Sequence, residues 1–232
     1  MLERDPWTWN ELSQRGVLRH DGVGSFQGET VLCYGWNVNG IRAVARKGLL
    51  PWQQLPRADI FCLQETKAHV EQLDPEVGEP TGWHAYYSCS QRRGYSGVAI
   101  ISRERPDEIV EGLGVKKLDQ EGRVLRARFG NLLVVSAYFP KSQPEGPRLE
   151  YKLAFCKGIL RFLRKQVDTG LDVLLMGDYN IAHEPIDLAR PKENSGNPGF
   201  LPEERSWMTR FLNSGFHDVF RERNPTLAGA YS

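Results

Sequence analysis

The sequence predicts an α/β protein in which two packed β-sheets have helices on their outer sides. Apolar, strand-like runs recur from residue 30 onward, and most are apolar on both faces, as expected for strands buried between layers. A single doubly wound sheet is the alternative on pattern alone. It requires regular alternation of strand and helix, whereas residues 83–139 contain four strand patterns with little room for helices.

Seven segments have the length and composition of strands. They are Val31–Trp36, Ala58–Gln64, Trp83–Cys89, Gly97–Ser102, Val124–Phe129, Leu132–Phe139 and Leu171–Met176. The fifth and sixth are expected to form a hairpin, because Gly130-Asn131 between them is a strong two-residue turn signal.

Three segments have helical patterns. Pro147–Val167 carries apolar residues at helical spacing along one face. Pro202–Asn213 begins with proline and two glutamates, is followed by Gly215, and has Trp207 and Phe211 on its apolar face. A shorter helix is expected near Ile41–Lys47.

Composition favours an ordinary globular domain. The chain has 232 residues, of which 40% are hydrophobic and 25% charged, and this length fits one large domain. Residues 29–232 are expected to form it, with residues 1–28 as a weakly ordered extension. The net charge is only +1, so any affinity for phosphate must come from local clusters of Lys and Arg.

Neither a membrane span nor a secretory signal is expected. No apolar run approaches the roughly 20 residues that a span needs, and the N-terminus lacks an apolar core segment. The four cysteines show no CxxC spacing and are expected to be reduced and mostly buried. We therefore expect a cytoplasmic protein that is not secreted.

Polar side chains follow four of the apolar runs. The stretches are Trp36-Asn37-Val38-Asn39-Gly40, Leu63-Gln64-Glu65-Thr66-Lys67, Ala137-Tyr138-Phe139-Pro140 and Gly177-Asp178-Tyr179-Asn180. A carboxylate directly after a buried strand is costly unless it is paired, solvated or bound to a cation. Because Mg²⁺ prefers carboxylate and other oxygen ligands, the four strand ends together indicate a divalent-metal phosphodiesterase.

These stretches also carry a resemblance to a known family. With Gly94–Ala99 and Arg190–Arg205 they resemble the exodeoxyribonuclease III family of class II AP endonucleases, within the endonuclease/exonuclease/phosphatase superfamily. The resemblance runs from Thr30 to the C-terminus almost without a gap. It implies a four-layer α/β-sandwich and hydrolysis of DNA phosphodiesters that depends on Mg²⁺ or Mn²⁺. It implies a role in base-excision repair, with incision 5′ to abasic sites and 3′→5′ exonuclease action on double-stranded DNA. It also implies a monomer associated with the nucleoid or nucleus.

The resemblance also assigns roles to individual residues. Those implied as metal ligands are Asn37, Glu65, Asp178 and Asn180, and those implied as catalytic are Tyr138, Asp178 and Asn180. Residues implied beside the DNA are Asn39, Arg42, Lys67, Tyr95 and Lys141. Lys141 stands where many relatives have Asn after the Tyr-x-Pro motif.

Family members continue beyond the point that corresponds to Ser232, with further strands and a catalytic histidine. We therefore expect the last strands to be missing and hydrolysis to be impaired in this form. The alternatives are a catalytically inactive DNA- or metal-binding fragment, or a related phosphodiesterase with a non-DNA substrate. The stretch Lys192–Arg205 argues against the last.

Overall fold

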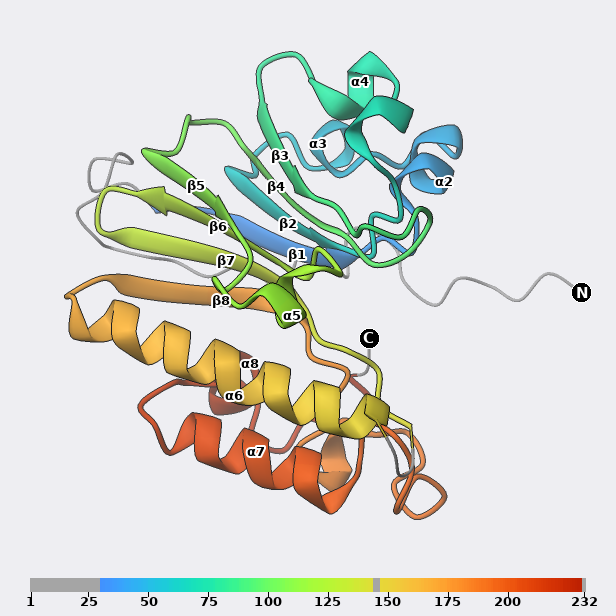
Figure 1. Cartoon of the computed structure of the whole chain (residues 1–232), viewed down its shortest axis with the longest axis vertical. Helices are drawn as coiled ribbons and strands as arrows, with labels where there is room; N and C mark the ends of the chain where they lie inside the picture. Colours follow the sequence, from blue (N-terminus) through green and yellow to red (C-terminus); the bar gives the residue numbers. More distant parts are fainter. Residues whose placement is uncertain (1–29, 144–146, 231–232) are drawn as a thin grey trace, which may run out of the picture. The chain divides into compact units, whose positions relative to one another are not determined.

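A computed structural model describes residues 30–143 and 147–230 (Figure 1). The extension expected at residues 1–28 lies outside the described residues. The described chain forms two compact units. The first contains the residues up to Ala137 together with Leu171–Gly177, and the second contains Tyr138–Gly170 together with the residues from Asp178 onward.

The strands form two four-stranded sheets. The first has the order β1 (Cys33–Asn37), β2 (Ile60–Gln64), β4 (Val98–Ser102) and β3 (His84–Ser88). β1 pairs with β2 in parallel, and the other two pairs are antiparallel. The second has the order β5 (Glu108–Glu111), β6 (Val124–Phe129), β7 (Leu132–Tyr138) and β8 (Asp172–Asp178). The predicted two-sheet α/β fold is thereby confirmed.

The predicted hairpin is also confirmed. Phe129 pairs with Leu132, which leaves Gly130 and Asn131 as the two turn residues. Gly130 has a φ of 58°, a conformation that glycine adopts without steric cost.

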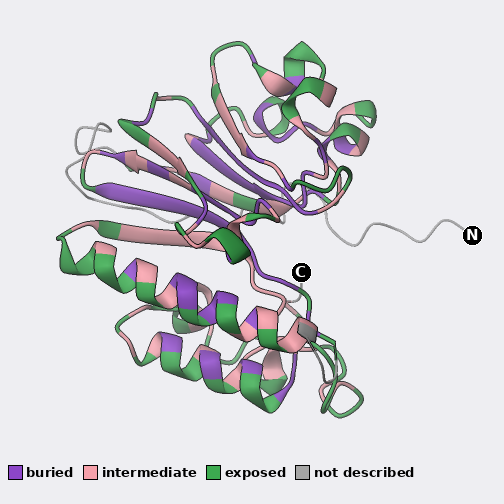
Figure 2. Cartoon of the chain, viewed as in Figure 1, coloured by how far each residue is buried: buried purple, intermediate pink, exposed green. Residues whose placement is uncertain are grey.

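Alternate side chains of β2 point to opposite faces of the first sheet, and both faces are buried. Phe61 and Leu63 pack in a hydrophobic cluster with residues of α2 (Ile41–Arg46), α3 (Pro51–Gln54) and α4 (Pro75–Gly78). On the opposite face, the Gln64 amide donates to Ser136 Oγ of β7 at 3.2 Å. Ser136 Oγ in turn donates to the Leu63 carbonyl oxygen at 3.2 Å. Burial on both faces explains the continuous apolar pattern of β2 and β7 (Figure 2).

The second unit is built on three helices, α6 (Pro147–Asp168), α7 (Pro202–Leu212) and α8 (Val219–Arg223). α6 shows buried and exposed stripes along its length (Figure 2). Between α6 and α7, the Phe139 ring lies 5.1 Å from Phe155 and 5.5 Å from Trp207, measured between centroids. The Trp207 indole donates to the Cys156 carbonyl oxygen at 3.0 Å, so the predicted apolar face of the second helix packs as expected.

Several short elements were not predicted. They are β5, α3, α4, α5 (Lys116–Asp119), α8 and the 3₁₀ turns η1 (Val70–Gln72) and η2 (Pro185–Asp187). Elements of three to five residues are too short to show a helical period. β5 lies at a sheet edge, and its two apolar residues are only half-buried.

The cysteine prediction is confirmed. All four cysteines are free, and three of them are buried. Burial raises the pKa of the Cys33 and Cys156 thiols to about 12, so both stay protonated at neutral pH. Within the described residues, no helix has the length and hydropathy required to cross a membrane.

Gly177 marks a close approach between β7 and β8. A Cβ atom built on Gly177 would lie 2.0 Å from the carbonyl oxygen of Ala137. Only glycine allows the two backbones to come this near. The glycine before Asp178 therefore allows β8, the strand that ends at Asp178, to lie this close to β7.

We expect Gly177→Ala to lower the free energy of unfolding by about 2–3 kcal/mol, because β7 and β8 must move apart. Gly35→Ala is the matched control. Its Cβ would meet the end of the flexible Met176 side chain at 3.4 Å, and the expected change is below about 1 kcal/mol. Urea unfolding midpoints measure both, and equal shifts would contradict the steric account.

Candidate active site

Glu65 lies directly after β2, where its carboxylate is held by two neighbours. Its residue surface is 6% exposed. Oε1 accepts a hydrogen bond from Asn37 Nδ2 at 2.9 Å, and Oε2 lies 2.7 Å from Lys67 Nζ. The parallel register pairs Asn37 with Gln64, which brings these polar groups to the same end of β1 and β2.

Asn39 completes this first cluster. The Lys67 ammonium also donates to Asn39 Oδ1, and the Asn39 backbone N–H donates to Asn37 Oδ1 at 3.0 Å. Oxygens of Glu65 and Asn39 therefore both contact the Lys67 ammonium. Such a set of carboxylate and amide oxygens fits a hard divalent cation.

Backbone strain is concentrated in these loops. Among the described residues, the non-glycine positions with positive φ are Asn39, Glu65, Lys67, Ser96 and Asn180. Each such position costs on the order of 1–3 kcal/mol and persists only where the surroundings enforce it, often at functional sites. Four of the five are residues for which the sequence predicted a role.

Ser96 and Gly97 hold the Glu65 loop in place, a role that the sequence did not reveal. The Lys67 N–H donates to the Ser96 carbonyl at 2.9 Å, and the Thr66 N–H donates to the Gly97 carbonyl at 3.1 Å. A Cβ on Gly97 would lie 2.3 Å from Thr66 Oγ1. The Ser96-Gly97 pair within the predicted motif is the only sequence signal for this contact.

Two further predicted DNA contacts belong to the first unit. Arg42 is exposed on the first turn of α2. The Tyr95 hydroxyl accepts a hydrogen bond from Arg123 Nη2 at 2.9 Å. Arg123 is only 2% exposed and is paired with Glu121 at 2.6 Å, so a buried cation that the sequence did not single out orients Tyr95.

Asp178 and Asn180 form a second cluster in the second unit. The Asn180 N–H donates to Asp178 Oδ1 at 2.9 Å, and Asn180 Nδ2 donates to the Phe139 carbonyl oxygen at 2.9 Å. The Phe139 N–H donates to the Asp178 carbonyl at 2.9 Å, which aligns Asp178 with the residue after Tyr138. Tyr138 itself is 5% exposed.

A buried ion pair supports this cluster. Lys152 Nζ lies 2.6 Å from both the Asn180 carbonyl oxygen and Glu204 Oε1, and both charged side chains are fully buried. Glu204 also accepts hydrogen bonds from Ser142 Oγ and the Leu201 N–H, at 2.6 and 3.0 Å. Burial lowers the pKa of the Lys152 ammonium, and Glu204 acts in the opposite direction.

Sequence reasoning did not identify this pair. Lys152 follows a helical pattern, and Glu204 was interpreted as a favourable first-turn acid of α7. The only signal is the place of Glu204 within the family-like stretch Arg190–Arg205. The burial of Glu204 depends on the packing of α7 against α6, which a local sequence pattern does not show.

Lys141 and Asn180 line one cavity of about 360 Å³ in the second unit. Asn194 and Phe200 of the following loop also contribute to its wall. The loop is braced by Arg205, whose Nε donates to the His183 carbonyl at 2.7 Å. His183 Nε2 lies 2.8 Å from Thr209 Oγ1, so this histidine makes a structural hydrogen bond to α7.

The structure thus gathers the predicted residues into clusters within each unit. Asn37, Asn39, Glu65 and Lys67 contact one another in the first, and Asp178 and Asn180 do so in the second. Among the described residues, no group of three or more His, Cys, Asp or Glu side chains is placed to hold a metal ion. The oxygen-rich first cluster relies on amides beside a single carboxylate.

Comparison with known proteins identifies the family. The model of the endonuclease/exonuclease/phosphatase family matches residues 35–228. The chain belongs to this family. It is 42% identical to an exodeoxyribonuclease of Bacillus subtilis over 198 residues, which cover 85% of this chain and 77% of the relative.

Other members of the family support the same conclusion. The chain is 40% identical to the DNA repair nuclease APEX1 of Danio rerio over 85% of its length, and it spans 64% of that relative. An AP endonuclease from Archaeoglobus fulgidus has the same fold, with a TM-score of 0.75 and 30% identity over 84% of this chain and 75% of that one.

These relatives confirm the predicted membership in the exodeoxyribonuclease III and AP endonuclease group. They also confirm the main functional prediction, a DNA-repair nuclease. They do not favour an inactive DNA- or metal-binding fragment or a related phosphodiesterase with a non-DNA substrate.

We expect Lys152→Met to lower the free energy of unfolding by about 3–5 kcal/mol, because it leaves the Glu204 carboxylate buried without its cation. Urea unfolding measures the change. The double variant Lys152→Met/Glu204→Leu removes both charges and is expected to be less destabilised than the single variant.

Glu203→Gln is the matched control for this pair. Glu203 lies in the same turn of α7 but is exposed, so the expected change is within about 0.5 kcal/mol. A Lys152→Met variant as stable as the Glu203→Gln variant would show that the buried ion pair is not needed.

Proposed function

We propose that this nuclease hydrolyses DNA phosphodiesters 5′ to abasic sites and at 3′ ends, with Mg²⁺ or Mn²⁺ as its cation. The observation that carries the proposal is the first cluster. There the nearly buried Glu65 carboxylate and Asn39 Oδ1 hold the Lys67 ammonium, on a backbone with positive φ at all three residues. A site preformed at this cost of strain is suited to a charged ligand.

Glu65 and Asn37 are the proposed cation ligands of the first unit. A divalent cation bound there would neutralise phosphate charge and stabilise the leaving oxygen. Two side chains define the surroundings of such a cation. Glu65 supplies the negative charge, and Asn37 fixes the orientation of that carboxylate through its 2.9 Å hydrogen bond.

Asp178 is the proposed general base, and Asn180 its positioning partner. The carboxylate of Asp178 would take a proton from water as the water oxygen bonds to phosphorus and the bond to the leaving sugar oxygen breaks. The Asn180 N–H fixes Asp178 Oδ1. Lys152 fixes the Asn180 carbonyl in turn.

Tyr138 is proposed to donate from its hydroxyl to a non-bridging phosphate oxygen, where charge increases during hydrolysis. Asn39, Arg42, Lys67, Tyr95 and Lys141 are proposed DNA contacts. Phosphate contacts of this kind weaken as salt concentration rises. The relatives named as DNA repair nuclease and AP endonuclease support the choice of DNA as substrate.

The proposed reaction is tested on a duplex that contains one abasic analogue. With Mg²⁺, we expect a nick 5′ to the analogue and none in excess EDTA. Asp178→Asn is expected to lower the rate at least about 100-fold, because the general base is lost. Glu76→Gln, an exposed carboxylate of α4, is the control and is expected to keep the wild-type rate. Unchanged nicking by Asp178→Asn would rule out its proposed role.

Cation binding is tested separately from catalysis. Mg²⁺ at 100 times its dissociation constant is expected to raise the free energy of unfolding by about 2.7 kcal/mol. Glu65→Gln is expected to remove that increase, whereas Glu79→Gln, an exposed glutamate after α4, retains it. Urea titrations with and without Mg²⁺ give the comparison, and an increase that survives in Glu65→Gln would place the cation elsewhere.

A further inference from the structure

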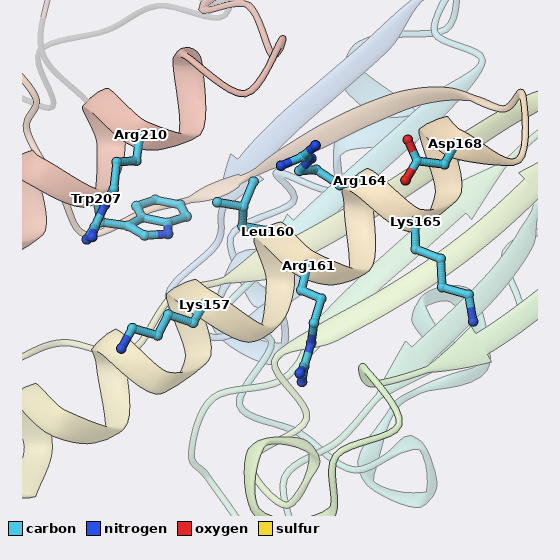
Figure 3. A pocket seen from close by; sticks show the side chains of 8 residues that line it. All are labelled: Lys157, Leu160, Arg161, Arg164, Lys165, Asp168, Trp207 and Arg210. Atoms are coloured by element: carbon cyan, nitrogen blue, oxygen red, sulfur yellow. The ribbon is translucent and has the colours of Figure 1, made fainter.

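A groove lined mainly by cationic side chains lies between α6 and α7 in the second unit. Its volume is about 510 Å³, and its basic residues are Lys157, Arg161, Arg164, Lys165 and Arg210. Figure 3 shows Trp207 of α7 pointing towards Leu160 of α6 within this groove. None of these residues belongs to the candidate active site.

The positive charge of the groove is local. Five basic residues and a single carboxylate, that of Asp168, line it, although the whole chain carries a net charge of only +1. Lys157, Arg161 and Lys165 follow one another at four-residue intervals along α6, so they lie on one helix face. Like charges at this spacing repel and weaken a helix, and an anionic ligand would relieve that repulsion.

The basic side chains of the groove are available for a ligand. Elsewhere in the second unit, Arg205 pairs with Glu184 and Arg221 pairs with Asp187. By contrast, no hydrogen bond or ion pair connects the five basic side chains of the groove to another residue in the described part of the chain. Within the described structure these five charges are therefore unpaired, and the Asp168 carboxylate is the single opposite charge in the groove lining.

The groove also has an apolar floor. Leu160 is half-buried and provides the accessible apolar surface. The Trp207 indole next to it is only 1% exposed and is fixed by its hydrogen bond to the Cys156 carbonyl at 3.0 Å. A ligand that matches both features needs an apolar side chain flanked by negative charges. A DNA duplex offers the charges, which lie on its phosphate backbone, but no apolar side chain for the floor.

We propose that the α6–α7 groove binds an acidic peptide segment of a partner protein. An apolar side chain of the segment packs on Leu160, and its carboxylates pair with the basic residues around it. The cavity volume suits a few side chains rather than a whole domain face. Charge complementarity would speed association and make it sensitive to salt. The interaction is separate from the proposed hydrolysis.

Fluorescence anisotropy of a labelled synthetic peptide tests the proposal on the full chain. The peptide has aspartates on both sides of a central leucine. We expect it to bind the wild-type chain, and the double variant Arg161→Glu/Arg164→Glu to bind at least about tenfold more weakly. Arg210→Glu is a second variant, on α7, with the same expected direction. Peptides with Asn in place of Asp, or Ala in place of Leu, are expected to lose affinity.

The matched control is Lys116→Glu/Lys117→Glu, which makes the same change of net charge at two exposed residues of α5. It is expected to bind the peptide like the wild type. Circular dichroism verifies that each variant is folded. Nicking of the abasic duplex is expected to be unchanged in Arg161→Glu/Arg164→Glu, so a failure of the proposed hydrolysis leaves this test intact.

Four results would overturn the proposal. The first is absence of peptide binding, and the second is an equal loss of binding in the control variant. The third is a loss of affinity for the abasic duplex in Arg161→Glu/Arg164→Glu, which would make the groove a DNA surface. The fourth is a dimer in sedimentation velocity that only the groove variants dissociate, which would make a second copy of the chain its occupant.

Discussion

A carboxylate at the end of a buried strand needs a cation or hydrogen-bond donors close by, and this requirement shapes the loops around Glu65. Both carboxylate oxygens are engaged, one by the Asn37 amide and one by the Lys67 ammonium. The loops that supply these partners have positive φ at Asn39, Glu65 and Lys67. The energy stored there is offset by the sheet and by the backbone contacts to Ser96 and Gly97.

The second unit meets a similar requirement with a buried ion pair. Lys152 and Glu204 lie on different helices, and each is fully buried. Desolvation of two charges makes such a pair a weak source of stability. Its value here is positional, because the same ammonium fixes the backbone carbonyl of Asn180. The ion pair between α6 and α7 thus helps to position the loop that carries Asp178.

Several features were predictable because they depend on local pattern. The strands with continuous apolar runs, the Gly130-Asn131 hairpin and the helix beginning at Pro147 follow from side-chain periodicity and turn chemistry. β5 was missed because an edge strand with two half-buried apolar residues has little periodic signal. The short helices α3, α4 and α5 were missed because one turn cannot establish a period.

The sequence by itself determined the strand ends, the polar residues that follow them and the family that these motifs resemble. These features are local in the chain, so they can be recognised without coordinates. Only the tertiary structure decided that Glu204 is buried against Lys152, that Arg123 orients Tyr95 and that Gly177 touches the Ala137 carbonyl. Each of these contacts joins residues that are distant in sequence, and burial of a charged side chain depends on which elements pack around it.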